Sequence, residues 1–252
     1  MADICFCIPA RYESSRLDKK LLLALDGETC IKKTVGQVLK SKYANHNVYV
    51  LTDSELIQQE VSNLNCEVIM TPGEYCNGTE RISKNLHLLP DKYRFIVNIQ
   101  ADEPYISHLN IDEAIVKHLD SADNTQNIFY TTLHEENNSP EYLHSTASLK
   151  LVTDNRNNVV YYSRNIIPWN KRNEMRKDYT YKTFTGIYVF NRPLLEKYHS
   201  LGNTELQLEE DCEQLKIIEN GFTIKTYPTI EYNEISLNTM EDYQYLLDKY
   251  TN

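Results

Sequence analysis

Glycine is scarce in this sequence, with seven among 252 residues. Loops that hold phosphates with backbone N–H groups usually depend on glycine, because its missing Cβ lets the backbone approach the ligand closely. The stretch IPARYESSRLDKKLL, residues 8–22, follows the first apolar run in the position of such a loop, yet it contains no glycine. If this opening loop binds phosphate, it must do so with its cationic side chains: Arg11, Arg16, Lys19 and Lys20.

Paired metal-binding motifs are also absent. The six cysteines form no CxxC pair and the seven histidines no HxxxH pair, so the sequence makes no case for zinc. Cys5 and Cys7 alternate within an apolar run, and we expect both to lie in the core as reduced thiols of a cytosolic protein.

A basic excess and long apolar runs are missing as well. The net charge of −10 and the pI of about 5.2 argue against a nucleic-acid or anionic-membrane partner. No run approaches the length that spans a bilayer, and residues 1–10 lack the basic n-region of a signal peptide. We therefore expect a cytoplasmic protein that binds a small anion where its basic residues are concentrated.

Short apolar runs alternate with helical patterns in the first hundred residues. This spacing predicts βαβ units and a parallel sheet, in which ligands bind beyond the carboxyl ends of the strands. The predicted strands cover residues 4–10, 47–52, 66–70 and 94–100.

Strands dominate the second half, with candidates at 127–133, 147–154, 158–169, 181–191 and 222–228. A helix is expected over 208–221, ended by Gly221, and a closing helix over 238–250, with Asn238 as its N-cap. The sequence thus predicts one α/β domain over residues 1–252. It has a mixed, mostly parallel sheet with helices on both faces and a β-rich excursion at about 130–190.

Three short polar stretches follow predicted strands. Asp102, in the turn QADEPY, is a natural ligand for Mg²⁺, although a surface turn explains the same residues. The stretch NGTERI, 77–82, places Thr79 and Arg81 at a helix N-terminus that favours anions, but N-capping also explains Thr79. The cations of the opening loop could neutralise a triphosphate, or simply pair with Glu13 and Asp18.

The order of the motifs is more specific than any one of them. In order, the motifs are IPARYESSRLDKK (8–20), NGTER (77–81), VNIQADEP (97–104), YYSRNIIPW (161–169), GIYVF (186–190) and EQLKIIENG (213–221). With this set the chain resembles the 3-deoxy-manno-octulosonate (Kdo) cytidylyltransferases, or CMP-Kdo synthetases, and the first, third and fourth motifs are specific to that family and its nearest relatives.

The resemblance implies a nucleotide-diphosphosugar transferase fold, a homodimer, and transfer of CMP from CTP to an acidic keto-sugar with Mg²⁺ in lipopolysaccharide biosynthesis. It assigns catalysis to Arg11, Lys20 and Asp102, and the metal to Asp102 and Asn238. The nucleotide set it implies is Pro9, Ala10, Arg11, Arg16, Lys20, Asn77, Gly78, Thr79, Arg81, Gln100 and Asp102. The sugar set is Gln100, Arg164, Tyr188, Glu213 and Gln214.

Four positions depart from the family's pattern. Lys19 and Ala101 stand where the family has glycine, and Phe184 stands where it usually has a sugar-contacting histidine. Asn238 replaces the family's second metal-binding aspartate. Two alternatives therefore stay open: a catalytically impaired nucleotide- or sugar-binding relative, and an enzyme for another acidic sugar, such as 8-amino-Kdo or a nonulosonic acid.

Overall fold

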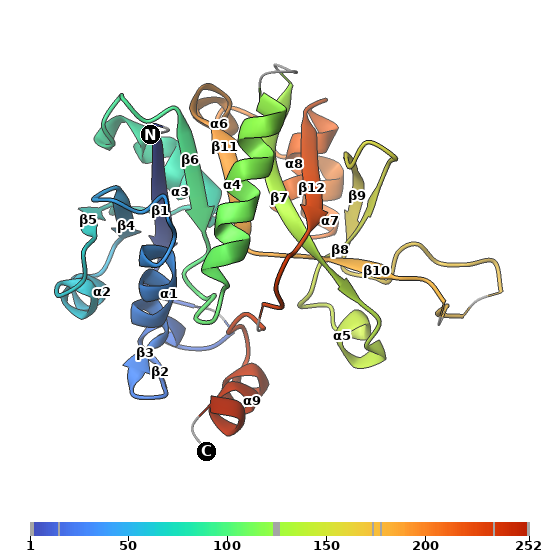
Figure 1. The fold of residues 1–252 in the computed structure, drawn as a ribbon, viewed down its shortest axis with the longest axis horizontal. Coiled ribbons are helices and arrows are strands. Elements are labelled where there is room, and N and C mark those ends of the chain that lie inside the picture. The colour runs from blue at the N-terminus through green and yellow to red at the C-terminus, as the bar shows by residue number, and fades with distance from the viewer. Residues whose placement is uncertain are drawn as a thin grey trace.

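The computed structural model describes residues 3–14, 16–122, 127–172, 174–176, 178–233 and 235–250, so Ser15 of the opening loop and the chain ends of the predicted domain lie outside the described residues. A large central sheet crosses the molecule (Figure 1). Its strands are β1 (Ile4–Ala10), β4 (Val48–Thr52), β5 (Glu67–Met70), β6 (Phe95–Ile99), β7 (Ile128–Asn137), β8 (Lys150–Thr153), β9 (Val159–Ser163), β10 (Tyr181–Phe184), β11 (Ile187–Asn191) and β12 (Thr223–Pro228). A separate small ribbon pairs β2 (Ala24–Leu25) with β3 (Glu28–Thr29).

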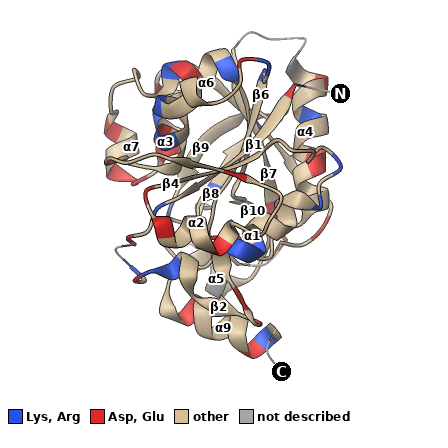
Figure 2. Cartoon of the chain, turned by 90° about the vertical axis from the view of Figure 1, so that its left-hand side faces the viewer, with Lys and Arg blue, Asp and Glu red and all other residues tan. Residues whose placement is uncertain are grey.

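Helices cover both faces of this sheet (Figure 1). They are α1 (Cys30–Leu39), α2 (Glu55–Val61), α3 (Gly78–Asn85), α4 (His108–Ala122), α5 (Pro140–His144), α6 (Arg192–Tyr198), α7 (Glu205–Glu209), α8 (Glu213–Glu219) and α9 (Met240–Tyr250), with short 3-10 turns at Lys20–Leu22 and Leu86–Leu88. None of these described helices is long and apolar enough to span a bilayer. Figure 2 shows both signs of charge on α3 and on α6.

The strand order is β5-β4-β1-β6-β11-β7-β10-β8-β9, with β12 beside β7. Neighbours from β5 to β6 run parallel, as expected for βαβ units. Strand β11 enters antiparallel between β6 and β7, and β10, β8 and β9 extend the sheet in antiparallel fashion. The predicted fold class, a mixed α/β sheet with helices on both faces, is confirmed.

Strand β1 separates two hydrophobic cores. Ile4, Phe6 and Ile8 face the core that holds α1 and α4, while Cys5 and Cys7 face the core beneath α3, α6 and α8. This division follows from the alternation of side chains along a strand. The expectation that both cysteines are buried core residues is confirmed.

The helix predicted over 208–221 is wrong as a single element. It is broken between α7 and α8, where Asp211 has a φ of 45°, and Leu208 is 64% exposed instead of inward. The cause is tertiary: Arg164 binds the backbone carbonyls of Glu210 and Asp211, which a continuous helix would use internally.

The strand predicted over 181–191 is also two elements. It divides at Gly186, after which β11 inserts between β6 and β7 while β10 pairs with β7 and β8. The strand predicted over 158–169 ends at Ser163, and α4 was not anticipated by the strand pattern.

The N-cap of α9 is Thr239 instead of the expected Asn238. The Thr239 hydroxyl accepts from the backbone N–H of Asp242, whose carboxylate accepts from the N–H groups of Thr239 and Asn238. The side chain of Asn238 is therefore not needed for capping.

Candidate active site

A cavity of about 890 Å³ opens beyond the end of β6. Beside it lies a smaller pocket of about 230 Å³, enclosed by the opening loop and the start of α3. The two spaces adjoin, because four of the sequence-predicted residues line both: Arg16, Asn77, Gln100 and Asp102.

The cations of the opening loop each have a different environment at the site. Lys20 is buried and forms an ion pair with the carboxylate of Asp102, while Arg16 donates to the side-chain oxygen of Asn238 at 3.1 Å. Arg11 is exposed on the wall of the smaller pocket. Lys19 has a φ of 49°, in the left-handed region that favours glycine, and its amine lies 5.9 Å from the centre of the Tyr12 ring.

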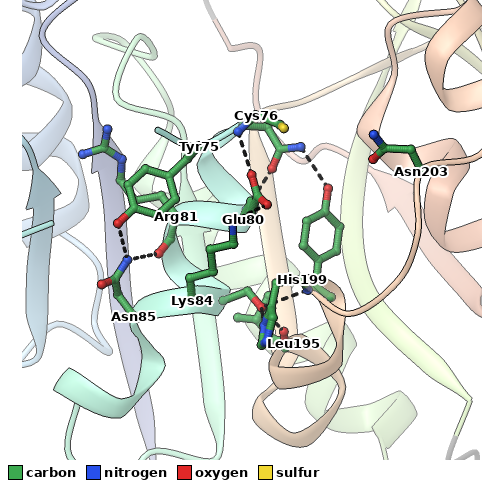
Figure 3. Close-up of polar contacts among 12 residues, drawn as sticks. Tyr75, Cys76, Glu80, Arg81, Lys84, Asn85, Leu195, His199 and Asn203 are labelled. Atoms are coloured by element: carbon green, nitrogen blue, oxygen red, sulfur yellow. Dashed lines mark hydrogen bonds and ion pairs between the residues drawn. The ribbon is translucent and has the colours of Figure 1, made fainter. Parts of the chain in front are cut away.

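The N-terminus of α3 forms another wall of the smaller pocket. Asn77 caps the helix, accepting from the N–H of Glu80 at 2.8 Å, and donates to the hydroxyl of Tyr198 at 3.0 Å. Glu80 in turn accepts from the N–H of Cys76 (Figure 3). Capping thus belongs to Asn77, and the Thr79 hydroxyl is left for other contacts.

Gly78 lies where a larger residue does not fit. A Cβ there would come within 2.7 Å of Pro9 Cγ and 3.3 Å of Gln100 Oε1. The absence of a side chain therefore lets α3 begin directly against the ends of β1 and β6.

Arg81 is buried and its charge is already neutralised. Its guanidinium donates to Asp53 at 2.7 Å and to the Thr71 hydroxyl at 3.1 Å, and it stacks 4.8 Å from the ring centre of Tyr75 (Figure 3). Burial raises the pKa of Asp53, but hydrogen bonds from Arg81 and the Tyr12 N–H outweigh it, so the pKa lies below its ordinary value. Arg81 thus shapes the pocket more than it offers free charge.

Asp102 and Asn238 bring oxygen atoms to the same cavity. The Leu237 N–H donates to the Asp102 carbonyl at 2.9 Å, which holds the segment before α9 against the turn after β6. Within the described ranges, no three His, Cys, Asp or Glu side chains come together as a metal cluster. One carboxylate and one amide oxygen fit an Mg²⁺ ion that takes the rest of its shell from substrate phosphates and water.

Glu103 is a buried carboxyl that the sequence analysis passed over. Burial, together with the negative charge of Asp102, raises its pKa to about 8. It accepts a hydrogen bond from the Ser236 hydroxyl at 2.6 Å and lies against Gly186.

Residues that the family resemblance assigns to the sugar lie on the far side of the larger cavity. Gln214 donates to the Tyr188 hydroxyl at 3.1 Å, and Glu213 accepts from Thr79 at 3.1 Å. Burial raises the pKa of Glu213, and its second oxygen meets no hydrogen-bond partner among the described residues. Phe184 also lines this cavity and packs edge-on against Tyr188, with ring centres 5.2 Å apart.

Arg164 lines the cavity but is heavily engaged. Its guanidinium donates to the carbonyl oxygens of Thr146, Glu210 and Asp211 at 2.6–2.9 Å. These contacts hold the break between α7 and α8, and the guanidinium lies 3.5 Å from the Asp211 carboxylate.

The structure brings most of the predicted residues together around the two spaces. Ala10 and Thr79 line neither of them: Ala10 is buried at the end of β1, and the Thr79 hydroxyl links Glu213 to Asn98. The residues that do line them are Pro9, Arg11, Arg16, Lys20, Asn77, Gly78, Arg81, Gln100, Asp102, Arg164, Tyr188, Glu213, Gln214 and Asn238.

Comparison with known proteins identifies the family to which the chain is similar. A family model described as cytidylyltransferase matches residues 5–226. The chain is 35% identical to a 3-deoxy-manno-octulosonate cytidylyltransferase of Protochlamydia amoebophila, covering 93% of this chain and 89% of that one. It is 36% identical to the mitochondrial enzyme of that name from Arabidopsis thaliana, covering 93% and 79%. Among solved structures, a CMP:2-keto-3-deoxy-manno-octonic acid synthetase complexed with CTP superimposes with a TM-score of 0.86 at 25% identity, covering 98% and 97%.

Proposed function

This chain belongs to the family of 3-deoxy-manno-octulosonate cytidylyltransferases, and we propose that it joins CTP and Kdo to give CMP-Kdo and pyrophosphate. The observation that carries the proposal is that a small cation-lined pocket adjoins a larger polar cavity, with Asp102 in the wall of both. Two substrates could meet there, one from each side.

The smaller pocket suits the phosphates of CTP. Arg11, Arg16 and Lys20 present their cations there from a loop without glycine, so side chains replace backbone N–H groups as the phosphate donors. Lys20 exchanges its present partner, Asp102, for a phosphate oxygen when the nucleotide enters.

The reaction is a displacement at phosphorus. The anomeric hydroxyl of the sugar attacks the α-phosphorus, the new P–O bond forms, and the bond to the β-phosphate oxygen breaks. The proton of the hydroxyl passes to solvent and pyrophosphate leaves. Such chemistry depends on positioning and charge neutralisation.

Asp102 and Asn238 would hold Mg²⁺, which supplies charge neutralisation at the phosphates when it is bound. Asp102 contributes a negative charge, whereas Asn238 contributes only a carbonyl oxygen. The cations around this junction therefore share the work of neutralising the substrate.

The larger cavity suits the acidic sugar. Gln100, Tyr188 and Gln214 offer hydrogen bonds to its hydroxyls, and the unpartnered oxygen of Glu213 adds another. Arg164 is a cation in the wall of this cavity, and it would meet the sugar carboxylate while remaining bound to the backbone. The family also suggests a homodimer, a cytoplasmic enzyme and a product that enters lipopolysaccharide.

Two observations favour alternatives within the same site. Asn238, in place of the family's second metal-binding aspartate, favours an impaired relative that binds nucleotide without fast turnover. The apolar ring of Phe184 in the sugar cavity favours a different acidic sugar, such as 8-amino-Kdo or a nonulosonic acid.

Pyrophosphate release tests the proposal. Purified protein with CTP, Mg²⁺ and Kdo should release pyrophosphate, and UTP in place of CTP should give little. Asp102→Asn should lower the rate by about 100-fold or more. Absence of release with Kdo, 8-amino-Kdo and nonulosonic acids, together with calorimetric CTP binding that ignores Mg²⁺, would establish the impaired relative instead.

A further inference from the structure

Glu103 lies one residue after the proposed metal ligand, but the proposed chemistry gives it no task. We propose that Glu103 is a positioning residue that locks the turn bearing Asp102 to the segment bearing Asn238 and to the strand junction before Tyr188. The inference rests on the proposed function, because it assigns a purpose to the alignment of these three parts.

The first link runs to the segment before α9. The Ser236 hydroxyl donates to Glu103 Oε1 at 2.6 Å, and the next residue, Leu237, donates its N–H to the Asp102 carbonyl at 2.9 Å. These two hydrogen bonds lie immediately before Asn238. They fix where the Asn238 side chain can reach relative to the carboxylate of Asp102.

The second link runs to the junction of β10 and β11. A Cβ at Gly186 would lie 2.5 Å from Glu103 Oε1 and 3.0 Å from its Cδ and Cγ atoms, so the carboxyl occupies the space that a side chain would need. The Gln100 N–H donates to the Gly186 carbonyl at 3.3 Å, which ties the same junction to the turn. Tyr188 of the sugar cavity follows two residues later.

Packing alone does not account for a carboxyl here. Burying a carboxyl beside Asp102 is unfavourable, because burial removes its hydrating water and the charge of Asp102 opposes its ionisation. An apolar side chain would fill this space at lower cost. The hydrogen bond to Ser236 supplies what an apolar side chain cannot: a directional contact with the segment that carries Asn238.

Loss of the hydrogen bond between Ser236 and Glu103 should produce a specific defect in metal binding. The segment before α9 should move more freely, so binding of the metal–nucleotide complex should weaken while the rest of the fold persists. Other polar contacts hold the same segment further from the site: the Ser107 hydroxyl donates to the Glu231 carboxylate at 2.6 Å, and the Asn110 side chain donates to the Glu231 carbonyl at 2.7 Å.

Ser236→Ala is the direct test, and Ser107→Ala is its matched control. Both remove a 2.6 Å serine–glutamate hydrogen bond from the same segment, but only Ser236 borders the site. We expect Ser236→Ala to raise the Mg²⁺ concentration for half-maximal rate about five- to tenfold, and to weaken Mn²⁺ binding in the presence of CTP, measured by electron paramagnetic resonance, by a similar factor. Ser107→Ala should change neither, and Glu103→Gln, which keeps the acceptor oxygen, should remain within about threefold of wild type.

A second test uses Gly186. Gly186→Ala should weaken Mn²⁺ binding in the wild-type background but have little effect in a Glu103→Ala background, where the added Cβ has room. Equal effects in the two backgrounds, or a Ser236→Ala variant that matches Ser107→Ala, would overturn the inference. If the wild type releases no pyrophosphate from any sugar, the proposed function fails, whereas the Mn²⁺ measurements still decide the role of Glu103.

Discussion

Arg16 donates a hydrogen bond from Nη2 to Oδ1 of Asn238 at 3.1 Å, which joins two residues 222 positions apart in the sequence. Since Thr239 caps α9, the Asn238 oxygen is available for this contact. The contact places the amide beside the opening loop, on the cavity that Asp102 also lines. It makes position 238 the most informative one at the proposed metal junction.

Asn238→Asp should tighten metal binding. A second carboxylate adds a unit charge beside Mg²⁺ and keeps an acceptor for Arg16. We expect the Mg²⁺ concentration for half-maximal rate to fall about fivefold or more, with a rise in turnover if metal binding limits it. Magnesium titrations of pyrophosphate release measure both quantities.

The control is Asn203→Asp, which adds the same charge at an exposed position on the other side of the cavity. It should leave the magnesium titration nearly unchanged. Equal titrations for the wild type and Asn238→Asp would show that position 238 does not reach the metal.

Lys19→Gly should stabilise the protein. Lys19 has a φ of 49° and a ψ of 31°, a backbone conformation that costs an L-residue energy but that glycine adopts freely. Glycine also adds entropy to the unfolded chain, which offsets part of this benefit. We therefore expect a net gain of about 0.5–1 kcal/mol in the free energy of unfolding. Urea denaturation measures it.

Lys19→Ala separates the backbone from the charge. Alanine removes the amine but retains the Cβ, so it should bring no comparable gain. If alanine stabilises as much as glycine, the cause is the lost charge and the backbone explanation is wrong.

Gly78→Ala should damage the nucleotide pocket. Its Cβ would lie 2.7 Å from Pro9, and this overpacking should cost about 1–3 kcal/mol of stability and raise the KM for CTP. Gly36→Ala is the control, because Gly36 lies within α1 with open space around its missing Cβ and should stabilise by about 0.5–1 kcal/mol. Thermal unfolding and CTP titrations distinguish the two. A Gly78→Ala protein with unchanged stability and KM would show that α3 can retreat from Pro9.

The sequence predicted the parallel half of the sheet well, because buried strands are continuous apolar runs separated by amphipathic helices. β1 and β4 lie within one residue of their expected bounds. The break at Asp211 could not be predicted, because it is produced by Arg164, nearly fifty positions earlier, binding backbone carbonyls. Helix α4 could have been predicted from the helical spacing of Ile111, Ala114 and Ile115, which form one buried face.

The site was predictable where the motifs themselves carry the chemistry. Asp102 lines both pockets, and Lys20, its ion-pair partner, lines the smaller one, as expected for residues beyond the strand ends of a parallel sheet. The ion-pair partner of Arg81 was not predictable, because it is Asp53, which follows β4 and is brought to α3 only by the fold. Glu103 was missed for the same reason: its meaning depends on Ser236, which the sequence places 133 positions away.

Acid should destabilise the fold through two buried histidines. Burial lowers the pKa of His118 and of His134 to about 4, with Lys182 adding to the effect at His134. In the unfolded chain a histidine titrates at about 6.5, so between pH 6.5 and 4 the unfolded state binds protons that the folded state does not. Stability is therefore present above about pH 6.5 and is lost as the pH falls, by up to about 1.4 kcal/mol per pH unit for each histidine.

Urea denaturation from pH 7 to pH 5 measures this slope. His134→Gln removes one titrating group while leaving Thr226, its hydrogen-bond partner at 2.9 Å, a side-chain amide to pair with. It should be less stable than the wild type at pH 7, and its stability should depend on pH less steeply than that of the wild type by up to about 1.4 kcal/mol per pH unit. The raised pKa values of Glu103 and Glu213 act with the opposite sign in this window, but they are common to both proteins and cancel in the difference. Carboxylates with lowered pKa values, such as Asp53 and Glu80, act mainly below about pH 4.5, outside this window. An unchanged slope in both His134→Gln and His118→Gln would therefore mean that neither imidazole stays neutral inside the fold.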